Sequence, residues 1–124
     1  MPHLLERITL AYYVSLMDRR EQPQAALELL ILKTLAAGPN HGFGIALFIE
    51  ETSSALLRVE EGSLYPALHR LDKAGFIDAE WTVTPNGRRA RVYRLTRPGR
   101  KRLKEIEESW ATLTEGVRRV LRWA

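Results

Sequence analysis

The sequence contains no cysteine, and this absence excludes several kinds of chemistry. A chain of 124 residues without cysteine has no disulfide, no thiolate nucleophile and no cysteine-ligated metal site. Its histidines, His3, His41 and His69, do not stand at the i, i+4 spacing of a helical metal site. It also lacks a nucleophile elbow and a glycine-rich phosphate loop. We therefore expect no metal, no cofactor and no enzymatic activity, and the composition suits the reducing cytoplasm.

Long hydrophobic runs are missing as well. The longest, from Ile8 to Met17, has about half of the ~20 apolar residues that a membrane span needs. The flank before it has no net positive charge, since Glu6 offsets Arg7, and no small-residue cleavage site follows it, so we expect neither a membrane anchor nor a secretory signal. Hydrophobic residues make up 45% of the chain and charged residues 27%, which is typical of a globular protein.

Acidic residues are absent from one segment, and this absence dominates the charge pattern. Residues 81–104 hold nine arginines and lysines and no acid, whereas the other 100 residues carry 10 basic and 15 acidic side chains. The simplest interpretation of a charge run is a solvated face. A basic segment on an otherwise acidic chain, however, favours a polyanionic partner such as a nucleic acid.

Hydrophobic periodicity predicts a mainly α fold with one small β-hairpin. A strong turn signal, Pro85-Asn86-Gly87, separates the two runs of strand-like alternation. The hairpin is expected over 76–83 and 91–96, and the helices over 4–17, 25–37, 41–52, 60–74 and 97–124.

Local signals refine the ends of these elements. We expect Asn40 to cap the helix over 41–52 and Thr96 to cap the last helix. Pro66 falls inside the helix over 60–74, where it removes a hydrogen bond and is expected to bend or loosen the first turn. Gly44 is costly inside a helix, which indicates close packing against a neighbour.

The last helix carries an apolar stripe that its own small domain is not expected to cover. The spacing alternates between three and four residues, as in a coiled-coil heptad. We therefore predict that a second copy of the chain covers it, through Leu103, Ile106, Trp110, Leu113, Val117 and Val120.

Several motifs together resemble the PadR family of bacterial transcriptional regulators. They are Glu61 to Leu71 (EGSLYPALHRL), Gly75-Phe76-Ile77, Gly87-Arg88-Arg89, Tyr93 to Arg100 (YRLTRPGR) and His41 to Ile45 (HGFGI). The resemblance covers about residues 25–104. It implies a winged helix-turn-helix protein that binds double-stranded DNA as a homodimer, usually as a repressor. The last helix would make the dimer, often with help from an N-terminal helix.

The resemblance also implies which residues face DNA. Ser63 and Tyr65 match DNA-facing positions of the family's recognition helix. Their hydroxyl groups can donate hydrogen bonds to phosphate oxygens. The alternative for Tyr65 is a core aromatic residue. The full set of expected DNA contacts is Gly62, Ser63, Tyr65, His69 and Arg70 on the helix and Arg88, Arg89 and Arg91 on the wing.

Trp110 has two interpretations. Packing in the dimer seam is the simpler one. Alternatively, it stacks on a planar aromatic effector, because its Glu108-Ser109-Trp110 context resembles that of multidrug-sensing relatives.

The predicted organisation has three parts: an N-terminal helix and connector over 1–22, a winged helix-turn-helix over 23–96, and a dimerisation helix over 97–124. The predicted function is a cytoplasmic, homodimeric, sequence-specific DNA-binding regulator that acts as a repressor. Two alternatives remain: a sensor of planar aromatic ligands that acts at the dimer interface, and a winged-helix module that binds protein or RNA.

Overall fold

The structure, a computed structural model, describes residues 22–123. The helix predicted over residues 4–17 lies outside them. Within the described range, no helix is both long enough and apolar enough to cross a membrane.

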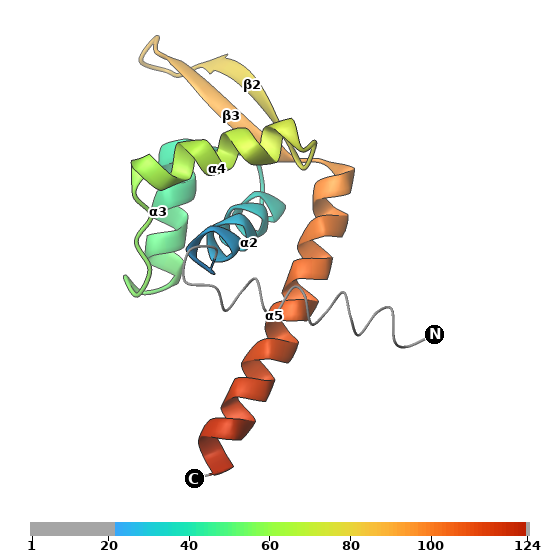
Figure 1. The fold of residues 1–124 in the computed structure, drawn as a ribbon. Helices are drawn as coiled ribbons and strands as arrows, with labels where there is room; N and C mark the ends of the chain where they lie inside the picture. The colour runs from blue at the N-terminus through green and yellow to red at the C-terminus, as the bar shows by residue number, and fades with distance from the viewer. Residues whose placement is uncertain (1–21, 124) are drawn as a thin grey trace.

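Four helices and three short strands make up this range (Figure 1). The predicted mainly α, winged helix-turn-helix fold is confirmed, with most element ends within about two residues of their predicted positions. The elements in chain order are α2 (Gln22–Ala36), β1 (Asn40–His41), α3 (Gly42–Thr52), α4 (Glu61–Lys73), β2 (Ile77–Val83), β3 (Arg89–Leu95) and α5 (Arg97–Trp123).

The sheet has one strand more than predicted. Its order is β1-β3-β2, all antiparallel, with Asn40 opposite Tyr93 and His41 opposite Val92. The prediction that Asn40 caps α3 is wrong, because Asn40 belongs to this added strand and His41 is the capping residue. The His41 Nδ1 atom accepts a hydrogen bond from the Gly44 amide at 3.0 Å. Gly44 gives room to the Asn40 side chain, which a Cβ at position 44 would displace.

The core is built around α2, which lies beneath α4 and between α3 and α5 (Figure 1). Ile31 and Leu32 of α2 are completely buried. Burial of such a side chain contributes roughly 1.5–3 kcal/mol, so this contact stabilises the domain strongly. The other elements contribute Ile45, Ile49, Leu64, Leu68, Ile77, Leu103 and Ile106.

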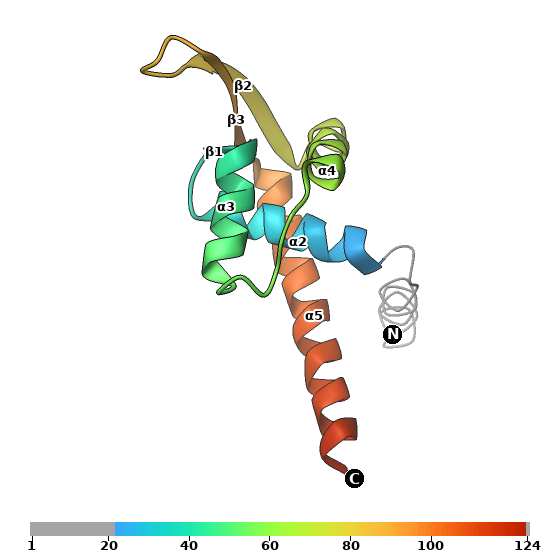
Figure 2. The same cartoon turned by 90° about the vertical axis from the view of Figure 1, so that its left-hand side faces the viewer.

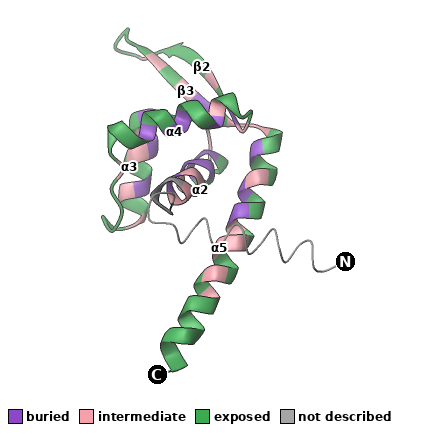
Figure 3. Cartoon of the chain, viewed as in Figure 1, coloured by how far each residue is buried: buried purple, intermediate pink, exposed green. Residues whose placement is uncertain are grey.

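α5 belongs to this core over its first half only. Thr96 caps it as predicted, since its Oγ1 accepts a hydrogen bond from the Gly99 amide at 3.0 Å. Leu103 and Ile106 are 7% and 2% exposed, because α2 of the same chain covers them. These two residues of the predicted dimer seam are therefore packed within the monomer. The second half of α5 projects away from the body and is mostly exposed (Figure 3).

Candidate nucleic-acid interface

α4 presents a continuous exposed stripe to solvent. Its buried side holds Leu64, Ala67, Leu68 and Leu71. Residues on the opposite side recur at helical spacing and are all exposed: Gly62, Pro66, His69 and Lys73. Gly62 and Pro66 have small side chains. A partner can therefore come close to the helix backbone along the first half of this stripe.

The remaining predicted residues of α4 lie on its two flanks. Ser63 and Arg70, seven residues apart, are exposed on one flank. Tyr65 is exposed on the other, together with the half-buried Asp72. The structure thus places all five predicted α4 residues on the surface, with His69 and Gly62 in the middle.

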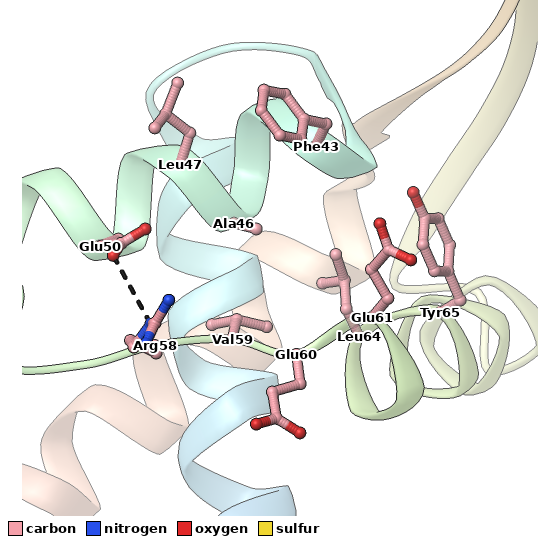
Figure 4. Close-up of a pocket in the computed structure, with 10 residues that line it drawn as sticks. All are labelled: Phe43, Ala46, Leu47, Glu50, Arg58, Val59, Glu60, Glu61, Leu64 and Tyr65. Carbon is pink, nitrogen blue, oxygen red and sulfur yellow. Dashed lines mark ion pairs between the residues drawn. The ribbon is translucent and has the colours of Figure 1, made fainter.

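Tyr65 lies at the surface against α3 and is not part of the core. Its side chain is 46% exposed. The ring lies against the first residue of α3, since a Cβ on Gly42 would stand 2.9 Å from the Tyr65 Cε1 atom. Figure 4 shows the ring standing off α4 with its hydroxyl at the far end. The absence of a side chain on Gly42 therefore makes room for the Tyr65 ring and its oxygen, while almost half of the residue stays exposed.

Pro66 leaves a backbone acceptor free on the same stripe. α4 runs without interruption from Glu61 to Lys73, although proline has no N–H to donate to the carbonyl of Gly62. That carbonyl lies on an exposed residue, where water or a ligand can reach it.

The hairpin of β2 and β3, residues 77–95, is the wing, and it projects from the body beside α4 (Figure 2). Its tip is a tight turn in which the Gly87 amide donates to the Thr84 carbonyl at 2.9 Å. Gly87 takes a φ of 77°, a conformation that L side chains rarely adopt. The predicted turn is therefore present, and it carries Arg88 and Arg89 directly after it.

The three predicted wing arginines are exposed but differ in their contacts. Arg91 is tied to α4 by an ion pair with Asp72 at 3.4 Å. The Arg89 guanidinium lies over the Trp81 ring at 4.7 Å from its centroid. Arg88 makes no ion pair or ring contact with residues 22–123. Arg88 and Arg89 are thus the wing charges available to a partner.

Tyr93 supports Arg91 from the base of the wing. It is 7% exposed, and burial raises the pKa of its hydroxyl, while the neighbouring Arg91 charge opposes that rise. The hydroxyl is therefore neutral at physiological pH, and the ring packs against the core.

A groove of about 350 Å³ separates the N-terminal part of α4 from α3 (Figure 4). Its lining includes Glu50, Glu60 and Glu61, and only Glu50 has an ion-pair partner there, Arg58 at 3.8 Å. This surplus of carboxylates repels phosphate. A nucleic acid backbone is therefore expected to follow the wing and the outer stripe of α4, and to meet this groove only at its edge, where Tyr65 lies (Figure 4).

The exposed half of α5 carries the rest of the predicted dimer seam. Trp110 and Leu113 are half-buried, and Val117 and Val120 are exposed. Leu121 and Trp123, also exposed, extend the apolar surface. The indole Nε1 of Trp110 is buried and has no hydrogen-bond partner among the described residues.

The described residues contain no group of three or more His, Cys, Asp or Glu side chains arranged to hold a metal ion. The predicted DNA-facing residues of α4 and the wing offer hydroxyl, imidazole, guanidinium and backbone groups. These groups bind polyanions and base edges by hydrogen bonds.

Comparison with known proteins agrees with this arrangement. The transcriptional regulator PadR-like family matches residues 31–105. The transcriptional regulator Rv3488 of Mycobacterium tuberculosis is 41% identical over 98 residues, which cover 79% of this chain and 88% of that protein.

Solved structures show the same fold. A transcriptional regulator from Clostridium thermocellum superimposes with a TM-score of 0.71 at 27% identity, covering 77% of this chain and 92% of that one. Bacillus subtilis PadR, solved in complex with operator DNA, superimposes with a TM-score of 0.59 at 26% identity and covers 64% of this chain and 45% of its own. From its sequence match and its fold, the chain belongs to the PadR-like family of transcriptional regulators.

Proposed function

We propose that the protein is a homodimeric, sequence-specific DNA-binding repressor. The observation that carries this proposal is the exposed stripe of α4, with the small residues Gly62 and Pro66, beside a wing whose Arg88 and Arg89 have no acidic partner among the described residues. The ion pair between Asp72 and Arg91 joins the two elements. The complex of Bacillus subtilis PadR with operator DNA supports the same use of the fold here.

In the proposed complex α4 enters the major groove. A helix fits this groove, where side chains read base edges, and His69 and Arg70 are the candidates for that role. Ser63 and Tyr65 donate to phosphates on either side, which sets the position of the helix. Arg88 and Arg89 contact phosphates of the neighbouring DNA backbone or enter the minor groove.

The dimer in this proposal forms through the second half of α5. Val117 and Val120 are exposed, Leu113 is half-buried, and Trp110 is half-buried at the edge of the core. A second copy would cover them and place two α4 helices on successive major grooves, about 34–36 Å apart. Repression then follows if the bound dimer occludes a promoter.

Selection of bound fragments from genomic DNA tests the proposal. We expect one recurrent, roughly palindromic sequence, bound by a dimer. A protein that binds no duplex even at low salt contradicts the proposal. A competition experiment at the same salt compares the affinities for duplex DNA and for single-stranded RNA. A higher affinity for duplex DNA argues against the alternative RNA-binding module.

A second function, sensing of an aromatic effector, is favoured by the position of Trp110, which is half-buried and packs at the edge of the core. Its Nε1 atom is buried, so a planar effector at the dimer interface would stack on the part of the side chain that stays exposed. Planar aromatic compounds should then quench tryptophan fluorescence in the wild type and not in Trp110→Phe. Equal quenching in both proteins would argue against this site.

A further inference from the structure

The wing exposes a large aromatic residue that the proposed function has not used. Trp81 of β2 is 56% exposed and Val83 is 72% exposed. Alternation along the strands places both on one face, opposite Arg91 and Arg89 of β3 respectively. Two apolar side chains and two arginines therefore share the outer part of one wing face.

The indole of Trp81 lies at the centre of this group. The Arg89 guanidinium is 4.7 Å and the Arg91 guanidinium 5.8 Å from the ring centroid. Both distances fall within the ~6 Å over which a cation is attracted to an aromatic ring. Arg89 reaches Trp81 diagonally, since its direct partner across the ladder is Val83.

The same face is turned toward α4. Arg91 contacts Asp72 of α4 at 3.4 Å, and its guanidinium also lies 5.9 Å from the Tyr93 ring centroid. Asp78 and Glu80 alternate with Trp81 along β2 and so lie on the opposite face, where Glu80 pairs with Arg94. The acids of β2 are thus kept away from the side of the wing that faces α4.

We infer that Trp81 is a positioning residue for DNA binding: its ring holds the Arg89 guanidinium on the α4 side of the wing, ready for a phosphate. This inference rests on the proposed function. An arginine side chain has many rotamers when free, and binding must restrict them. Preordering by the ring lowers that cost, while Arg91, held by Asp72, keeps the wing beside α4.

The test compares Trp81→Val with Trp81→Phe for affinity to one duplex at fixed salt. Valine suits a strand and removes the ring, whereas phenylalanine keeps a ring for the guanidinium. We expect Trp81→Val to weaken binding about two- to fivefold, the fold-change that an exposed cation–π contact represents, and Trp81→Phe to restore most of it. Val83→Thr, which removes apolar surface from the same face, serves as the matched control and should bind like the wild type.

A double-mutant comparison separates positioning from direct contact. In an Arg89→Ala background, Trp81→Val should cause little further loss, because the other guanidinium beside the ring, that of Arg91, is already held by Asp72. A full additional loss would mean that Trp81 touches DNA itself and would overturn the inference. Unchanged affinity of Trp81→Val in the wild-type background would overturn it as well, and it would leave the proposed function intact.

A measurement without DNA completes the test. In the free protein the Arg89 side-chain protons should show upfield ring-current shifts that are lost in Trp81→Val and retained in Trp81→Phe. Absence of these shifts in the wild type contradicts the stacking. Failure of the wild-type protein to bind any duplex would instead refute the proposed function, and the DNA role of Trp81 with it.

Discussion

At the scale of single residues, the candidate interface depends on close contacts that hold polar groups at the surface. Tyr65 is kept in place by Gly42, where any side chain would press on its ring. The fold therefore uses a glycine on α3 to orient a phenol on α4.

Tyr65→Phe should separate the role of the hydroxyl from that of the ring. The Tyr65 oxygen makes no hydrogen bond within the described residues, so the free energy of unfolding should stay within about 0.5 kcal/mol of the wild type. A lost hydrogen bond to a phosphate should weaken DNA binding about tenfold or more. Thermal unfolding and a DNA titration measure the two effects. Unchanged affinity would make Tyr65 a packing residue only.

Gly62→Ala should change stability and binding in opposite directions. A Cβ at this position meets nothing within 4 Å, and alanine favours a helix over glycine by about 1 kcal/mol. The added methyl group lies on the exposed stripe of α4, so it should keep DNA farther from the helix backbone. We expect a higher melting temperature and a weaker complex. A variant that is more stable and binds equally well would remove Gly62 from the interface.

Tyr93 should make stability fall at alkaline pH. Burial raises the pKa of its hydroxyl in the folded state above the ordinary value of 10.0. Its contribution is therefore complete below about pH 10 and is lost as the pH rises through the folded-state pKa, because the unfolded chain ionises first. Urea unfolding on both sides of pH 10 should show a steeper fall for the wild type than for Tyr93→Phe. Parallel curves would contradict the shift.

At the scale of elements, the wing and α4 form one unit. Local interactions end α4 at this point. Gly75 takes a φ of 83°, and the Phe76 amide donates a hydrogen bond to the Leu71 carbonyl at 3.0 Å. The chain thus leaves α4 directly into β2, and the wing starts beside the helix it assists.

Removing the wing charges should change how binding depends on salt. Each neutralised phosphate contributes about −0.9 to the slope of log affinity against log salt. The double variant Arg88→Ala/Arg89→Ala should flatten this slope by about 2 if both arginines contact phosphates. Arg118→Ala/Arg119→Ala, an equal change of charge near the end of α5, is the control and should leave the slope unchanged. An unchanged slope in the wing variant would contradict the wing contacts.

At the scale of the whole molecule, α5 serves two purposes along its length. Its first half completes the core on α2, and its second half extends from the body with an apolar surface. Stability and assembly should therefore respond to different positions on one helix.

Two variants of α5 should show this division. Ile106→Ala leaves a cavity in the core and should lower the free energy of unfolding by about 2–5 kcal/mol. Val117→Glu/Val120→Glu should leave the monomer folded and disrupt the proposed dimer, because carboxylates would be buried against each other. Circular dichroism and sedimentation measure the two outcomes. A double variant that remains dimeric would place the interface elsewhere.

Most of the fold could be predicted from the sequence because its signals are local. Helical spacing, Gly75 and the Pro85-Asn86-Gly87 turn specify element type and ends through a few neighbouring residues. The exposed positions of α4 could be predicted for the same reason, since the leucine stripe leaves the opposite side to solvent.

Long-range packing decided the rest. β1 has two polar residues and no alternation, and it exists only because β3 pairs with it from about 50 residues away. The heptad pattern of α5 identifies an apolar stripe but not what covers it, and α2 covers Leu103 and Ile106. The contacts of Trp81 with Arg89, and of Arg91 with Asp72, depend on strand register and on the docking of α4. The sequence by itself therefore determined the elements and the family, whereas the tertiary structure decided which side chains remain available to a partner.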